Sequence, residues 1–193
     1  MKQIILLLTI SITMFSLGCK NKAVKQATSV TDTTHFFSIG NFFLGEIKDV
    51  ETTPYLIYQI ITKGSGSKDS IAITKEIFAT ITKQFIACDI SDATKKQNYV
   101  ETAFKDNSTK SITLNYSTKN KDLPIQNIDI LFNEETNTVN RIFIRQILDN
   151  KDSSITILYS WKANKSFTIT KSIVKQNGTP YTDQQYVNWN DKN

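Results

Sequence analysis

The chain has 193 residues, two cysteines, one histidine and a formal net charge of +5. Isoleucine and threonine contribute 26 and 24 residues. Because β-branched side chains pack well on a pleated surface, this composition predicts a strand-rich globular protein. The same composition excludes a disulfide scaffold, a collagen-like chain and a coiled coil.

The first residues have the pattern of an export signal. Met1 and Lys2 form a short positive start, and residues 4–17 (IILLLTISITMFSL) are almost continuously apolar. These are the features of a secretory signal peptide. As a helix the apolar run would be about 21 Å long, short of a hydrocarbon core of roughly 30 Å, so a permanent transmembrane helix is disfavoured.

The apolar run ends in Ser16-Leu17-Gly18-Cys19. This segment resembles the lipobox of bacterial lipoproteins, in which small residues precede a cysteine, although leucine usually stands one position earlier. The resemblance covers the signal region only. It implies that residues 1–18 are a signal peptide and that Cys19 is the lipid-attachment residue, carrying a diacylglycerol and a fatty acid such as palmitate. An ordinary secretory cleavage nearby is the alternative.

The lipoprotein resemblance also implies a location, namely export followed by lipid anchoring to a bacterial envelope membrane. Residues 19–34 are polar and lack a periodic apolar face, which is typical of a flexible tether. Lys20, Lys22 and Lys25 would lie beside the acyl chains, where they either favour an anionic lipid surface or are simply solvated. No acidic cluster follows Cys19, so we expect the domain to face the periplasm.

Residues 35–193 are expected to form one α+β domain, beginning with helices. Apolar residues from Phe36 to Val50 recur at helical spacing, with Asp32, Thr33 or Thr34 as the expected cap. Gly40 and Gly45 argue against this helix, because glycine costs up to about 1 kcal/mol relative to alanine. A second helix follows Thr74, with an apolar stripe from Ile77 to Cys88.

Strand patterns occupy most of the remaining chain. Candidate strands are 55–62, 70–73, 99–105, 109–118, 125–132, 139–148, 154–161, 166–175 and 181–189. Short turn signals separate them, among them Asn177-Gly178, and short turns join antiparallel neighbours. Apolar residues alternate at period two in the later strands, so one sheet face is apolar. We therefore predict an antiparallel meander of about six to eight strands with one face covered by two helices.

No residue pattern for catalysis or metal binding is present. Cys88 falls on the apolar stripe of the second helix and reads as a buried structural thiol, and His35 is the only histidine. One histidine and one free cysteine disfavour a zinc site. No phosphate-binding glycine loop, serine elbow or calcium loop occurs. We predict no catalytic residue, no metal and no cofactor, and hence no enzyme.

The strongest candidate for ligand contact is Arg141-Ile142-Phe143-Ile144-Arg145. These are the only two arginines in the chain, and their spacing places both on one sheet face beside Phe143. Arginine is favoured where a planar fork meets a carboxylate or a phosphate. Arg141, Phe143 and Arg145 are therefore candidate contacts for an anion or ligand. The alternative is cross-strand pairing with an acid such as Asp129.

A second surface combines lysines with aromatic residues, namely Lys162, Lys165, Lys171 and Lys175 with Trp161 and Phe167. A nucleic-acid partner is not expected, because the predicted location is outside the cytoplasm. Lysines that protect strand edges are the commoner explanation.

Two functional hypotheses remain. In the first, an envelope lipoprotein binds a small apolar or anionic ligand through its sheet, as a lipid carrier would on an apolar concave face. In the second, a scaffolding lipoprotein meets another envelope protein, through aromatic residues such as Tyr181, Tyr186 and Trp189.

Overall fold

The computed structural model describes residues 36–176 and 178–191. The predicted signal peptide, the tether with Cys19, His35 and the Asn177 turn position lie outside the described residues. The elements are α2 (Ile39–Thr52), β1 (Ile57–Thr62), β2 (Lys68–Ile73), α3 (Lys75–Ala87), α4 (Ala93–Lys96), β3 (Val100–Asp106), β4 (Ser111–Ser117), β5 (Ile125–Asn133), β6 (Val139–Asp149), β7 (Ser153–Lys162), β8 (Ser166–Lys175) and β9 (Tyr181–Asn188).

All nine strands form one open antiparallel sheet in the order β2-β1-β9-β8-β7-β6-β5-β4-β3. Seven consecutive strands form the predicted meander, so the α+β class and the antiparallel arrangement are confirmed. The expected six to eight strands was too few. The β1–β2 hairpin joins the same sheet, because β9 pairs with β1 on one side and with β8 on the other.

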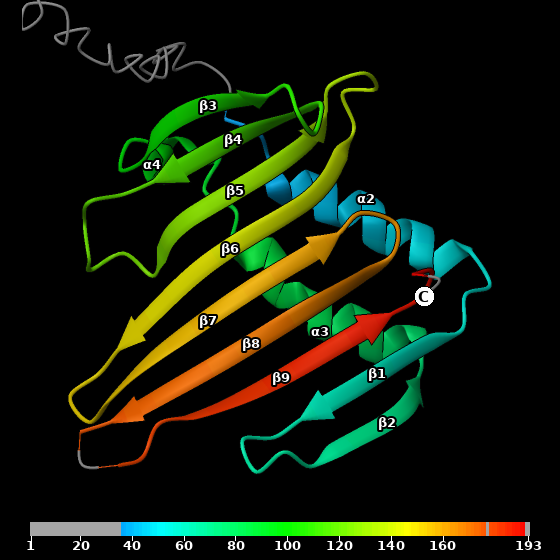
Figure 1. The fold of residues 1–193 in the computed structure, drawn as a ribbon, viewed down its shortest axis with the longest axis vertical. Coiled ribbons are helices and arrows are strands. Elements are labelled where there is room, and N and C mark those ends of the chain that lie inside the picture. The colour runs from blue at the N-terminus through cyan, green and yellow to red at the C-terminus, as the bar shows by residue number, and fades with distance from the viewer. Residues whose placement is uncertain (1–35, 177, 192–193) are drawn as a thin grey trace, which may run out of the picture.

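Helices α2 and α3 lie on one side of the sheet, behind it in Figure 1. Helix α2 begins later than predicted, because Ser38 and not a residue of 32–34 is its cap, with the Asn41 N–H donating to Ser38 Oγ at 3.2 Å. Thr74 caps α3 as predicted. Among the described residues no helix is long and apolar enough to cross a membrane.

The core lies between the two helices and the sheet and is unusually aromatic. Trp161 of β7 is fully buried, and its ring packs against Phe43 of α2, Phe85 of α3, Phe167 of β8 and Trp189. Such ring pairs contribute beyond their burial when they are offset or edge-on. The helices thereby occupy one sheet face, and the opposite face remains open.

A half-buried carboxylate joins α2 to the turn between β7 and β8. Glu46 accepts hydrogen bonds from the Trp161 indole N–H at 3.0 Å and from the Asn164 backbone N–H at 2.6 Å. Asn164 has a φ of 58°, a conformation that asparagine tolerates better than most residues. Glu46 therefore holds this turn in place from the helix side of the sheet.

Candidate functional site

Strand β6 carries both arginines on the open sheet face. Ile142 and Ile144 are buried under the helices, whereas Arg141 and Phe143 are half-buried and Arg145 is exposed on the other side. This alternation is the period-two pattern of a strand with one covered face. The Arg141 guanidinium carbon lies 5.6 Å from the centre of the Phe143 ring, within the range of a cation–π contact.

The arginines do not pair with the acid that the sequence offered as the alternative. Asp129 lies opposite Phe143 in register. Its two oxygens accept hydrogen bonds from the side-chain amides of Asn115 at 2.7 Å and Asn127 at 2.8 Å. Among the described residues, no carboxylate lies within 4.0 Å of either guanidinium. Their donors therefore remain available to a ligand.

Glu134 and Glu135, the acids of the β5–β6 turn, are also engaged elsewhere. They form ion pairs with Lys105 and Lys110 on the neighbouring β3–β4 hairpin. The carboxylates of this turn therefore pair with lysines and form no ion pair with Arg141.

Arg141 lines a hollow of about 320 Å³ at the end of the open face where the β5–β6 and β7–β8 turns meet. Its lining residues are Leu131, Asn140, Arg141, Lys162, Ala163 and Lys165. Register explains the grouping, because Arg141 on β6 lies directly opposite Lys162 on β7. Like charges at directly opposed positions destabilise a sheet, so this pair needs negative charge nearby.

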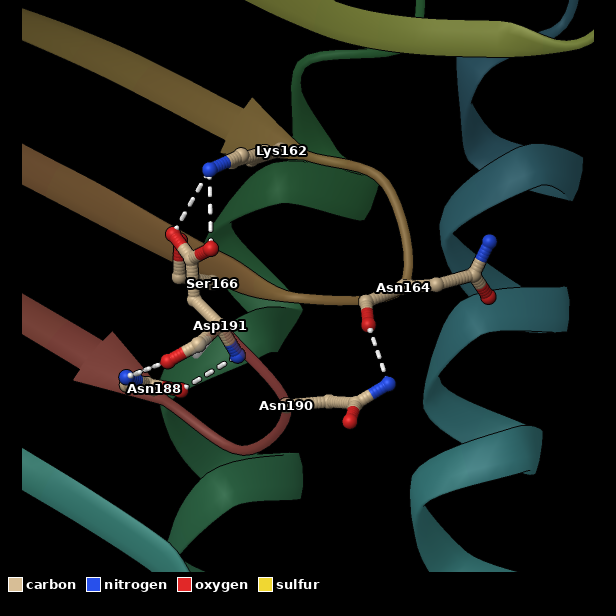
Figure 2. A network of polar contacts seen from close by, with 6 residues as sticks. All are labelled: Lys162, Asn164, Ser166, Asn188, Asn190 and Asp191. Atoms are coloured by element: carbon tan, nitrogen blue, oxygen red, sulfur yellow. Dashed lines mark hydrogen bonds and ion pairs between the residues drawn. The ribbon is translucent and has the colours of Figure 1, made fainter. Parts of the chain in front are cut away.

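Asp191 supplies part of that charge, as Figure 2 shows. Its two carboxylate oxygens accept from Lys162 Nζ at 2.8 and 2.9 Å, and one also accepts from Ser166 Oγ. These hydrogen bonds, that of Lys162 first, lower the pKa of Asp191. Lys162 is thereby held in place.

The segment around Asp191 is itself fixed to the β7–β8 turn. The Asn188 and Asp191 residues exchange two hydrogen bonds, and the Asn190 side chain donates to the Asn164 carbonyl at 3.1 Å (Figure 2). The backbone N–H groups of Trp189 and Asn190 both donate to the Lys165 carbonyl. The C-terminal segment and Glu46 therefore hold the turn that carries Lys165 from two sides.

Sequence reasoning identified Arg141 but missed the hollow. It grouped Lys162 and Lys165 with Lys171 and Lys175, which lie on the helix side of β8 by strand alternation. The aromatic residues assigned to that surface, Trp161 and Phe167, are buried in the core. No local pattern marks Asp191, because its partner is 29 residues earlier in the chain.

Arg145 and Phe143 lie further along the same face and outside the hollow. Arg145 faces Asn127 on β5 and Leu158 on β7 across the sheet. The three predicted contact residues therefore share a face, but only Arg141 joins a cluster of cations.

A second hollow, of about 290 Å³, lies at the end of α3 and has a largely apolar lining that includes Ile90, Tyr99 and Ile125. Two of its polar groups bind backbone carbonyls: Lys95 Nζ donates to the Asp89 carbonyl and the Tyr99 hydroxyl donates to the Ile125 carbonyl. Lys95 is its one cationic lining residue, so it has no cluster of cations like that around Arg141.

Cys88 is buried as predicted, and its thiol donates to the Gln84 carbonyl at 3.2 Å. Burial raises its pKa to about 12, so the thiol stays protonated and unreactive near neutral pH. Among the described residues, no three His, Cys, Asp or Glu side chains come together to hold a metal ion.

Trp189 is buried against Phe78 and Trp161. It therefore does not join Tyr181 and Tyr186 in an exposed aromatic patch. No family model, curated protein or solved structure matches this chain.

Proposed function

We propose that this protein is a lipid-anchored lipoprotein of a bacterial envelope whose residues 35–193 form a ligand- or partner-binding domain and not an enzyme. Ser16-Leu17-Gly18-Cys19 after an apolar run supports the anchor at Cys19 and the periplasm-facing location. Two or more acyl chains make such attachment stable, because each buried CH₂ contributes about 0.8 kcal/mol.

The observation that carries the binding role is the pair of arginines on the open sheet face. Arg141 and Arg145 flank Phe143, and neither has an acid partner among the described residues. A guanidinium fork matches a carboxylate or a phosphate, so two guanidinium groups that lack an acid partner and lie beside an aromatic ring favour a ligand with negative charge.

The composition of the open face favours a polar ligand over a lipid chain. Beside β6, this face carries hydroxyl and amide side chains, including Ser160, Thr168, Thr170, Asn115 and Asn127, and one strongly exposed aliphatic side chain, Leu158. A lipid carrier would need a broad apolar concavity here. Lipid carriage is therefore the weaker version of the ligand hypothesis.

A scaffolding role is the second candidate, with another envelope protein as partner. It is favoured by Val100 and Phe104 on the edge strand β3, which are 63% and 62% exposed on the same open face. Exposed apolar residues beside unpaired strand edges are typical of protein contact surfaces.

The experiment is crosslinking and co-purification from membranes with the anchor intact. We expect R141Q/R145Q to reduce recovery of the partner or ligand at least tenfold. The matched control is K171Q/K175Q, which removes the same charge from exposed positions on the helix side of β8 and should recover as much as wild type. Equal recovery with R141Q/R145Q would show that the open face is not the binding surface.

The anchor is tested separately by Cys19→Ser. We expect this variant to become a soluble or unprocessed exported protein when cells are fractionated. If it partitions into membranes like the wild type, the assignment of Cys19 is wrong.

A further inference from the structure

We infer that the hollow formed by Arg141, Lys162 and Lys165 is a site for a phosphomonoester group. This inference rests on the proposed binding role of the open face and names the chemistry that the face recognises. The hollow of about 320 Å³ lies at the lower end of the range of small-ligand sites, roughly 300–1,000 Å³.

The charge of the hollow matches a dianion. Three cationic side chains line it, and Asp191 forms an ion pair with only one of them, Lys162, while it attracts Lys165 more weakly. A phosphomonoester carries a charge of about −1.5 to −2 at pH 7, whereas a carboxylate or a phosphodiester carries one negative charge. The dianion would also remove the repulsion between Arg141 and Lys162, which lie directly opposite each other.

The free donors of the hollow also match a phosphoryl group. Lys162 directs two hydrogen bonds to Asp191, which leaves its third N–H available. Arg141 and Lys165 make no side-chain hydrogen bond to any described residue. Several acceptor oxygens on one phosphorus satisfy such a cluster, and the guanidinium can bind two of them in parallel.

Part of the hollow is already arranged for binding. Asp191, which accepts from Ser166, holds Lys162, while Glu46 and Asn190 hold the turn through Asn164. Side chains positioned before binding lose less entropy when the ligand arrives. Leu131 and Ala163 supply an apolar wall, against which the esterified part of the ligand would lie.

The test is isothermal titration calorimetry of the full chain in a nonionic detergent, with glycerol 3-phosphate, inorganic phosphate, sulfate and acetate as probes. At pH 7.5 we expect glycerol 3-phosphate and phosphate to bind at least tenfold more tightly than acetate. R141Q and K165Q should each weaken phosphate binding at least tenfold, whereas K171Q should leave it unchanged. K165Q is informative even if R141Q misfolds, because Lys165 is exposed.

The pH dependence provides a readout that general charge attraction would not give. The second pKa of a phosphomonoester is about 6, so its affinity should fall about tenfold between pH 7.5 and pH 5. Sulfate stays dianionic and should show no such change. The charged groups around the site are Arg141, Lys162, Lys165 and Asp191, together with Glu46, which accepts from the Asn164 N–H in the same turn and whose pKa is raised by burial. Titration of any of these protein groups would affect phosphomonoester and sulfate binding alike.

The phosphomonoester could belong to a lipid headgroup or to a soluble ester, and vesicle flotation separates these sources. We would use the Cys19→Ser chain with phosphatidylcholine vesicles, with and without phosphatidic acid. Flotation that needs phosphatidic acid and Arg141 identifies the headgroup, and binding of glycerol 3-phosphate without flotation identifies a soluble ester. Both outcomes support the phosphomonoester site.

The inference is overturned if phosphate and acetate bind equally, if no probe binds, or if K171Q weakens binding as much as R141Q does. Any of these results would reject the phosphomonoester chemistry. If R141Q/R145Q nevertheless loses the native partner in the co-purification, the binding role of the open face would stand.

Discussion

Glu46 shows how a single side chain links elements that are distant in sequence. Its carboxylate lies between α2 and the β7–β8 turn and accepts from Trp161 and Asn164. Burial raises its pKa above the ordinary value of 4.5, although both hydrogen bonds oppose the shift. The folded protein therefore binds this proton more tightly than the unfolded chain does.

The sign of the pH effect follows from that difference. The stability that a raised carboxyl pKa contributes is fully present below about pH 4.5 and falls as pH rises through the folded pKa. E46Q keeps an oxygen acceptor without the charge. We therefore expect the free energy of unfolding of E46Q, relative to that of wild type, to increase as pH rises from 4 to 7. E46A loses both acceptor contacts and should be about 2 kcal/mol less stable at pH 7.

Urea unfolding at several pH values measures both effects. The control is E51Q, which changes an exposed glutamate on the same helix and should follow wild type. A difference between E46Q and wild type that does not vary with pH would contradict the role of burial.

The position of Arg141 shows what a local sequence pattern can predict and what it cannot. Strand alternation predicted its face correctly. It could not predict that the side-chain amides of Asn115 and Asn127 donate hydrogen bonds to the Asp129 carboxylate, because those contacts depend on the register of three strands.

At the scale of the element, the two glycines of α2 have opposite environments. Gly40 is buried, and a Cβ there would lie 2.5 Å from Asp89 Oδ2 and 3.2 Å from Asp89 Cβ. That aspartate is fixed, because it accepts from Ser38 and Ser91. Gly45 has no atom within 4 Å of the same position. Only Gly40 is therefore required by packing.

The glycines make a matched pair for stability measurements. We expect G40A to destabilise the protein by about 1–3 kcal/mol, because a crowded site must shift to accept the methyl group. G45A should stabilise it by up to about 1 kcal/mol, since alanine favours an exposed helix position. Thermal or urea unfolding of the two variants measures both changes in stability. A stabilising effect of G40A would show that Asp89 moves aside freely.

The sequence located the strands better than the helix start. Period-two alternation is local, so the seven later strands fall close to their predicted ranges. The cap of α2 depended on where Phe36 and Phe37 pack: Phe36 lies against the Tyr116 ring, and the Phe37 N–H donates to the Tyr116 hydroxyl at 2.9 Å. These contacts hold both residues ahead of the helix, which then begins after Ser38.

At the scale of the whole molecule, β9 joins the meander to the early hairpin. It pairs with β8 and with β1, and the segment after it reaches the β7–β8 turn. Trp161 and Trp189 lie in the same core with their ring centres 5.3 Å apart. The meander, the hairpin and both helices therefore share one set of buried contacts.

We expect the described domain to unfold in one cooperative transition. The chain has only two tryptophans, so W161F and W189F each leave a single fluorescent reporter, one on β7 and one just after β9. In each variant, tryptophan emission and far-ultraviolet circular dichroism should give the same urea midpoint. Separate midpoints within one variant would show that part of the sheet unfolds independently.

By itself, the sequence determined the α+β class, the positions of most strands, the apolar sheet face and the burial of Cys88. These properties depend on residues within a few positions of each other, and periodicity reveals them. Only the tertiary structure decided that β9 lies between β8 and β1, that Arg141 faces Lys162, and that Asp191 and Glu46 hold the turn beside them. Those contacts join residues that are far apart in the chain, so they arise from strand register and helix packing, which local patterns do not encode.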